Sequence, residues 1–468
     1  KGKCEQVIMG EKRSLGTNGS WANGEVLRNT GWHLIAFQLL LIILFAITTG
    51  GGKQYTIGDE GKSGVLGYSM FSGVEIMMFI GFGYLMTFMK WYGVSAVGFT
   101  MVLVALALQW AVLTEAFFAQ WMELDDKDWH YVNVDIYALL DSLYAVSAVL
   151  ITFGALIGKV TPLQLLIVTI IELGLHSLNF KVILGGLYVS DLGGTYIDHM
   201  FGGYFGLAVA YMLGKPNREP EGGHSSDLFS FIGTLFLWIY WPSFVAGAAE
   251  PNSIQQQVAI VNTILALGSG TVTAFFFSSY MHEKGLFRPV DIQNATLAGG
   301  VAVGCVANLS IKPVGAILIG CIASAVSTYG FNTIQPYLEK EWGIHDTCGI
   351  HNLHALPSII GGIASVIVCA INSETDKEIF GDKADSQWWR QLVGMGATLG
   401  FALVTGIITG WICQQYAPEA NAIADYEDSE WWETAEDYGA GGEIKEATEN
   451  PTAEGEAAAG GEVEMTEA

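Results

Sequence analysis

Apolar residues gather in this chain into long runs that polar segments separate, and twelve of these runs can cross a membrane. A membrane helix needs about 20 predominantly apolar residues, because each residue adds about 1.5 Å and the hydrocarbon core is about 30 Å thick. The pattern therefore predicts an all-α polytopic membrane protein. The expected spans are residues 32–49, 68–89, 97–119, 132–158, 161–180, 196–213, 228–248, 256–281, 291–310, 313–333, 346–371 and 388–414.

The polar segments indicate an orientation. An even number of spans places both termini on one side. If that side is cytoplasmic, the inner segments hold thirteen Lys and Arg and the outer segments eight, which is the usual bias of short loops. Alternatively, the apolar run at 33–48 is a cleaved signal peptide, which leaves eleven spans. We favour a retained span, because more than thirty residues precede the run and no small-x-small cleavage site follows it.

The composition indicates a membrane protein, and the distribution of charge divides the chain into three segments. Only 14% of residues are charged, against about a quarter in soluble domains, and the 58 glycines are typical of closely packed membrane helices. Residues 417–468 hold sixteen acidic residues and one basic residue, Lys445. We therefore expect a cytoplasmic N-terminal segment (1–31), a transmembrane domain (32–416) and an acidic cytoplasmic tail (417–468), whose charge and low hydrophobicity predict disorder.

A pair of histidines 155 residues apart marks an internal repeat. Both copies follow the pattern D-x2-G-x4-H-x6-G, and five spans separate them, so they cross the membrane in opposite directions. Inverted repeats of this kind carry their substrate site near the midplane. Each His lies eight residues after its Asp, or about 12 Å along a helix, so the two can meet near the centre. The copies are Asp191, Gly194, His199 and Gly206, and Asp346, Gly349, His354 and Gly361.

Four further runs are distinctive: GFGYLMTF at 81–88, YGVSAVGF at 92–99, IGTLFLWIYWPSF at 232–244 and IQNATLAGGVAVG at 292–304. With DTCG at 346–349, they resemble the Rh glycoproteins of the ammonium transporter superfamily, over residues 68–416. The resemblance implies a homotrimer in the plasma membrane, in which each subunit encloses one narrow pore between two inverted five-helix repeats. It also implies ammonium or ammonia as the substrate.

The resemblance implies roles for five residues. His199 and His354 match the paired histidines that line the hydrophobic pore. Phe244 matches one of two stacked aromatic gate residues, and Tyr144 falls at the other, where the family more often has Phe. Asp191 matches the acidic residue near the outer mouth, although an Asp at this position is equally suited to cap a helix.

Desolvation favours ammonia over ammonium as the permeating species. Stripping water from a cation in an apolar pore is very costly unless charges or carbonyl rings replace it, whereas ammonia is neutral. The positions that form an ammonium site in bacterial transporters read here as Leu140, Asn179 and Ala248, so this mouth lacks most of an aromatic cage. We expect ammonium to lose its proton at the mouth and ammonia to pass two neutral imidazoles that share one ring proton.

Several alternatives stay open at this level. The same pore would admit carbon dioxide or another neutral gas, and a nonconducting scaffold or sensor is possible for the fold. An ion-coupled solute transporter would require more charges within the spans. We interpret His176 as a core side chain, and for His351 we favour a satisfied polar group at a helix end over a residue of the inner pore mouth. An enzyme is not indicated, no cofactor or metal site is expected, and no basic stripe suggests nucleic acid.

Overall fold

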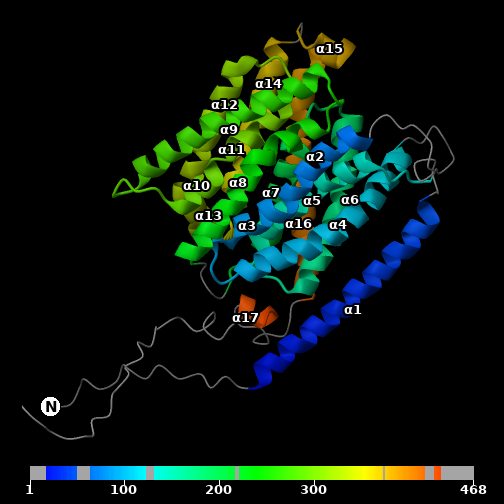
Figure 1. Ribbon diagram of the computed structural model, residues 1–468, viewed down its shortest axis with the longest axis vertical. Coiled ribbons are helices and arrows are strands. Elements are labelled where there is room, and N and C mark those ends of the chain that lie inside the picture. The colour runs from blue at the N-terminus through cyan, green and yellow to red at the C-terminus, as the bar shows by residue number, and fades with distance from the viewer. Residues whose placement is uncertain are drawn as a thin grey trace, which may run out of the picture.

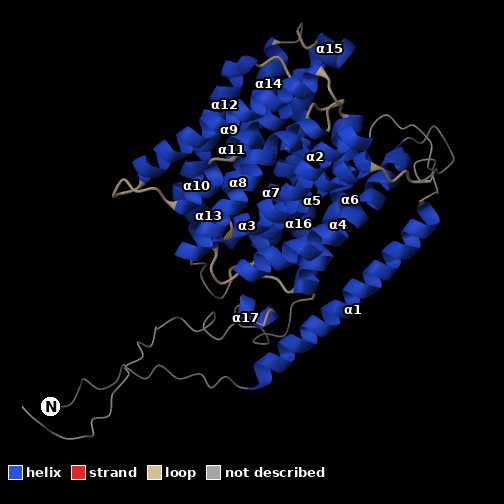
Figure 2. Ribbon diagram, viewed as in Figure 1, coloured by secondary structure: helices blue, strands red, loops and turns tan. Residues whose placement is uncertain are grey.

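The computed structural model describes residues 17–49, 64–122, 131–216, 221–372, 375–416 and 426–433. Regular structure within these ranges is helical (Figures 1 and 2), apart from an isolated bridge between Thr49 and Val132. The helices lie roughly side by side and form one bundle. The fold class is therefore the all-α bundle that the apolar runs predict.

The first six membrane crossings hold the first half of the repeat. Three of them change helical type along their length: the second crossing, the end of the fifth and the start of the sixth. They comprise α1 (Thr17–Thr48); α2 (Gly64–Ile76), η2 (Met77–Phe82), α3 (Gly83–Leu85) and η3 (Met86–Phe88); α4 (Gly93–Met122); α5 (Ile136–Leu156); α6 (Pro162–Phe180) and η4 (Lys181–Gly186); and η5 (Thr195–Met200) and α7 (Phe201–Leu213).

The remaining crossings hold the second half, followed by a short helix from the C-terminal segment. They comprise α8 (His224–Gly247); α9 (Ile254–Met281); α10 (Pro289–Ala295), α11 (Ala298–Val303) and η6 (Gly304–Val306); α12 (Lys312–Tyr329), η7 (Gly330–Ile334) and α13 (Gln335–Trp342); η8 (His351–Ala355) and α14 (Leu356–Ile371); α15 (Lys377–Phe380), η9 (Gly381–Ser386) and α16 (Gln387–Gln414); and finally α17 (Asp428–Trp431).

Ten described helices are long and apolar enough to span a membrane by themselves. The two other predicted spans have identifiable reasons to fall short. One carries Asp198 and His199 within its first turns, which lowers its hydropathy, and the other is interrupted between α10 and α11. The observed helices end within a few residues of most predicted boundaries, but α13 carries its crossing well past 333 to Trp342, and α1 begins at Thr17 rather than near residue 32.

Helix α1 lies along the outside of the bundle (Figure 1). Its buried apolar residues include Phe37 and Leu41, and they pack against leucines of α4 and α6. Residues on its other faces, such as Ile43, are exposed. In contrast, α5 is buried along most of its length and lies in the core of the bundle.

A short part of the acidic C-terminal segment packs against the bundle. Asp428 accepts bonds from the backbone N–H groups of Val94 and Ser95 (both 2.7 Å) at the start of α4. The Trp432 indole donates to Ser95 Oγ (2.9 Å) and lies 5.4 Å from the Phe99 ring. Burial raises the pKa of Asp428, whereas its bonds to Ser95 and Val94 lower it. The expected disordered tail is therefore replaced at 426–433 by a docked segment, and its other residues lie outside the described ranges.

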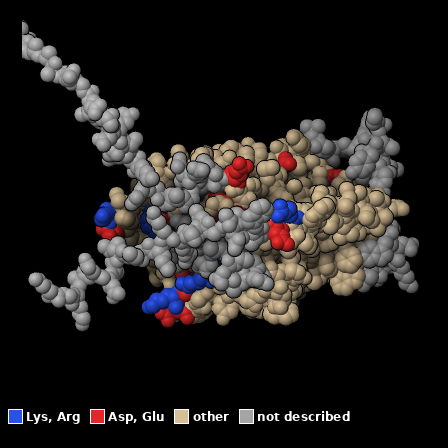
Figure 3. Space-filling model, turned by 90° about the horizontal axis from the view of Figure 1, so that it is seen from below, with Lys and Arg blue, Asp and Glu red and all other residues tan. Residues whose placement is uncertain are grey.

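Figure 3 shows the end of the molecule that carries α17. Its described charged side chains are few and scattered among uncharged ones. The described part of this face therefore has no continuous charged patch.

Candidate functional site

The first copy of the repeat begins with a capping aspartate. Asp191 Oδ2 accepts bonds from the backbone N–H groups of Tyr196 (2.7 Å) and Ile197 (2.9 Å). Gly194 has a φ of 69°, a left-handed conformation that glycine adopts without steric cost, and it turns the chain into η5. Burial raises the pKa of Asp191 to about 7, whereas the bonds from the backbone lower it. Asp191 thus holds the start of the crossing that carries His199.

The second copy repeats this arrangement. Asp346 Oδ1 accepts from the N–H groups of Gly349 and Ile350 (both 3.0 Å), and Oδ2 accepts from that of His351 (2.8 Å). Gly349 has a φ of 73°. Both copies then continue as a π-helix, η5 and η8, that contains the repeat histidine. Short π-helical turns are rare and occur frequently at functional sites.

The two repeat histidines meet inside the bundle. Their Nδ1 atoms are 3.2 Å apart, and the side chains are 1% and 3% exposed. Their rings belong to a stack of four, in the order Phe82, His354, His199 and Trp241, with centroids 6.0, 5.2 and 5.7 Å apart. A side chain at Gly300 would approach Trp241 Nε1 to 2.5 Å, so this glycine leaves the space that the stack occupies.

The two predicted gate residues contact each other and the first histidine. The Tyr144 and Phe244 rings meet edge to face, with centroids 4.9 Å apart and planes at 86°. The Phe244 ring lies 5.7 Å from that of His199. The Tyr144 hydroxyl lies against Gly247 at the end of α8, where there is no room for a side chain. The aromatic pair therefore closes the site on the side of His199.

On the other side, His354 faces a small apolar cavity. Its volume is about 20 Å³, and its lining includes Leu85, Leu150 and Leu353. A cavity of about 10–15 Å³ by this kind of measure can hold one water molecule. The space beyond His354 therefore suits one small molecule and offers few polar partners to it.

Three contacts of this site were not predicted from the sequence. Trp241 and Phe82 bracket the histidines, and both lie in runs that carry the family resemblance. Asp198, next to His199, bonds through Oδ1 to His176 Nε2 (2.9 Å), and both side chains are buried. An Asp inside an apolar run is rare enough to be a signal. His176 is a core side chain, as expected, with an acidic partner.

Two further histidines lie near the second copy. The His351 ring meets the Tyr204 ring at 6.3 Å, and it is buried rather than open to solvent. The carbonyl of His345 accepts a bond from the buried Lys159 ammonium. Burial and, to a smaller extent, the nearby Lys159 ammonium lower the pKa of His345 to about 4. Among the described residues, no group of three His, Cys, Asp or Glu could hold a metal ion.

Comparison with known proteins places this chain in a family. The sequence profile of the ammonium transporter family matches residues 32–419. The ammonium transporter Rh type C of Bos taurus is 41% identical over 388 residues, which cover 78% of this chain and 82% of the bovine protein. The ammonium transporter Rh type A of Mus musculus is 40% identical over 373 residues, which cover 78% and 81%.

Solved structures support the same family assignment. The Rh50 protein of Nitrosomonas europaea, described as one of the Rhesus protein family of channels, is 35% identical with a TM-score of 0.67, over 78% of this chain and 91% of Rh50. Saccharomyces cerevisiae Mep2 shares the fold, with 19% identity and a TM-score of 0.60, over 77% and 87%. The match to the family profile begins close to the first predicted span and ends just after α16.

Proposed function

Because this chain belongs to the ammonium transporter family, we propose that it conducts ammonia across a membrane through the site around His199 and His354. The observation that carries the proposal is the 3.2 Å approach of the two Nδ1 atoms between aromatic faces and an apolar cavity. The chain is an integral multi-pass membrane protein, and the plasma membrane is its proposed location.

The apolar surroundings favour a neutral substrate. An ion that enters this site loses its water and meets two imidazoles, aromatic rings and leucines, none of which replaces a hydration shell. Moving an isolated cation into such a medium costs several kcal/mol or more, whereas the penalty for a neutral amine is far smaller. Ammonium therefore leaves a proton outside the constriction, and ammonia passes.

The paired imidazoles can bond ammonia in transit. If both rings are neutral, one hydrogen lies between the two Nδ1 atoms. One ring then exposes an Nε2 acceptor and the other an Nε2–H donor. His199 Nε2 has no bonding partner among the described residues, so it is available to the substrate. Ammonia can donate to the acceptor and accept from the donor as it crosses the pair.

The aromatic pair on the side of His199 acts in this proposal as the gate. Tyr144 and Phe244 must separate for a molecule to reach His199, because their rings are in contact. Asp191 bonds the backbone at the start of η5, so we assign it a structural role at that end of the pore. We further propose a homotrimer, in which each subunit carries its own pore.

The test is stopped-flow fluorescence of purified protein in liposomes loaded with a pH dye and challenged with an ammonium gradient. Liposomes with the wild-type protein should alkalinise faster than empty ones. His354→Ala removes one hydrogen bond to ammonia, worth about 0.5–1.5 kcal/mol, so permeability should fall by about 2- to 12-fold. His33→Ala, on the exposed side of α1, is the matched control and should conduct normally.

Two outcomes would contradict the proposal. Wild-type rates equal to those of empty liposomes, for a protein that is intact by size-exclusion chromatography, would exclude conduction of ammonia. Equal rates for wild type and His354→Ala would place the path elsewhere. A carbon dioxide gradient across the same liposomes tests the gas-channel alternative, which predicts acidification that His354→Ala alters.

A further inference from the structure

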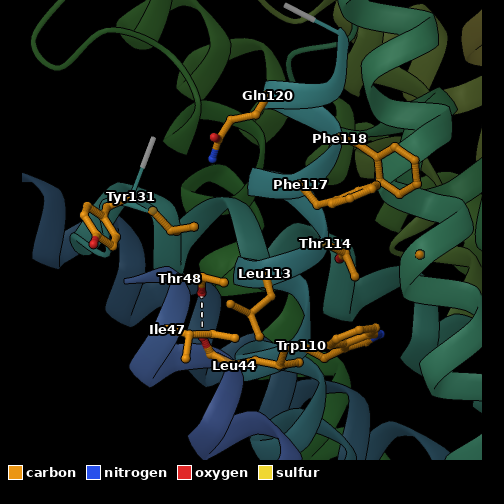
Figure 4. Close-up of a pocket in the computed structure, with 12 residues that line it drawn as sticks. Leu44, Ile47, Thr48, Trp110, Leu113, Thr114, Phe117, Phe118, Gln120 and Tyr131 are labelled. Carbon is orange, nitrogen blue, oxygen red and sulfur yellow. Dashed lines mark hydrogen bonds between the residues drawn. The ribbon is translucent and has the colours of Figure 1, made fainter. Parts of the chain in front are cut away.

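A large apolar cavity lies on the outside of the bundle, between helices that do not carry the paired histidines. It has a volume of about 580 Å³ and is lined by α1, α4 and α6 together with residues 131 and 132 (Figure 4). Sites for drug-sized molecules have volumes of about 300–1,000 Å³. The cavity therefore has room for an organic molecule.

The cavity results from the way α1 is attached. In its middle, α1 packs on the bundle through Phe37 and Leu41. At its end, Val132 donates a backbone bond to the Thr48 carbonyl (2.9 Å). Between these two attachments Leu44 and Phe45 still pack against the bundle, but the described side chains of α1, α4 and α6 leave a cavity beside them that is open to the surroundings of the bundle. In a membrane those surroundings are lipid.

The polarity of the lining changes along the cavity. Trp110 and Leu44 lie at the end of the cavity that is farther from the last residues of α1 and α4, and Phe117 lies along its wall (Figure 4). Gln120 and Tyr131 lie toward the end where α1 and α4 stop. The Trp110 indole N–H is already bonded to the Ile170 carbonyl (3.0 Å), so that ring presents apolar surface. The site thus suits an amphipathic molecule with an apolar body and a polar end at the interface.

The lining also indicates which amphipathic molecule fits. None of the twelve described residues that line the cavity is charged, so nothing there pairs with a phosphate. Flat aromatic walls suit a rigid fused-ring body, which loses less conformational freedom on binding than a flexible acyl chain. We propose that the cavity between α1, α4 and α6 binds a sterol, with its hydroxyl near Gln120 and Tyr131 and its rings against Trp110 and Phe117.

Gly174 provides a specific way to test this. It lines the cavity from α6, and a Cβ built on it meets no atom within 4 Å. Gly174→Leu therefore fills the cavity without displacing packed side chains. Gly400 on α16 likewise has nothing within 4 Å and lies outside the cavity. Gly400→Leu is the matched control for the effects of a new side chain in a helix.

The experiment uses a photoreactive cholesterol analogue on the purified full-length protein in liposomes, with the labelled peptides identified by mass spectrometry. Wild type and Gly400→Leu should be labelled on peptides from α1 and α4 that line the cavity, and excess cholesterol should remove the label. Gly174→Leu should lose most of that label, about tenfold or more, while it still purifies and sizes as the wild type does.

Three outcomes would overturn the proposal. Equal labelling of Gly174→Leu and wild type would show that the sterol binds elsewhere. Competition by phosphatidylcholine as strong as that by cholesterol would identify the occupant as an acyl chain. An unlabelled wild type would mean that another part of the chain or a second subunit covers the cavity.

Discussion

The two capping aspartates allow structural and substrate-binding roles to be separated. Both bonds to Asp191 converge on one oxygen, Oδ2. Asp191→Ala leaves two buried N–H groups without an acceptor, each at a cost of about 1–3 kcal/mol. Asp191→Asn keeps one carbonyl oxygen that can accept both bonds. We expect Asp191→Ala to lower the free energy of unfolding by about 2–6 kcal/mol and Asp191→Asn by less than about 1 kcal/mol.

Asp346 is the internal control, because its three bonds are divided between two oxygens. An asparagine there keeps only one of them, so Asp346→Asn should cost at least one buried hydrogen bond, about 1–3 kcal/mol. The expected order of stability is therefore wild type and Asp191→Asn, then Asp346→Asn, with both alanine variants lowest. The midpoint of thermal unfolding in detergent ranks the variants, and ammonium-driven alkalinisation of liposomes measures conduction.

The contribution of Asp191 to stability should fall as the pH rises. The folded pKa of Asp191, about 7, lies above its value of about 3.9 in an unfolded chain. Its contribution to stability is therefore fully present below the unfolded pKa and is lost as pH rises through the folded pKa. The stability of wild type relative to Asp191→Asn should decrease between pH 5 and about 8.

A measurement of conduction separates a capping role of Asp191 from a role in binding ammonium. If Asp191 acts only as a cap, Asp191→Asn conducts as the wild type does at neutral pH. A large loss of conduction in Asp191→Asn, with an unchanged unfolding midpoint, would refute this reasoning and show that the carboxylate acts on ammonium. An unfolding midpoint for Asp191→Asn as low as that of Asp191→Ala would refute the assignment of both bonds to one oxygen.

Three further substitutions test other parts of the structure. Tyr144→Phe keeps the ring contact and removes the hydroxyl, so stopped-flow conduction should stay within about twofold of wild type or rise; a collapse would assign the hydroxyl a role in the gate. Asp428→Ala removes the acceptor at the start of α4, at a cost of about 1 kcal/mol, and should speed proteolysis near Trp432; unchanged cleavage would contradict the docking. Gly349→Ala forces a left-handed residue against Phe331 and should lower the free energy of unfolding by more than about 1–2 kcal/mol, which is the cost of backbone strain alone.

Much of the site could be predicted, because its elements repeat at fixed spacing. The motif of Asp, Gly and His occurs twice, in spans that cross the membrane in opposite directions. It predicted that His199 and His354 meet, and their Nδ1 atoms are 3.2 Å apart. The bracketing rings of Phe82 and Trp241 were not predicted, since they come from helices that do not carry the repeated Asp-Gly-His motif and reach the histidines only through packing. The Asp198–His176 bond was missed for the same reason.

The sequence alone determined the class of protein and its membrane crossings, because hydrocarbon admits only segments that are long, apolar and internally hydrogen-bonded. Such constraints act on each segment separately and can be read from the order of residues. The tertiary structure decided what depends on contacts between distant segments: the stack of four rings, the docking of Asp428 on α4, and the cavity beside α1. These arise because side chains far apart in the chain must fill a common space, and no local pattern records how that space is shared.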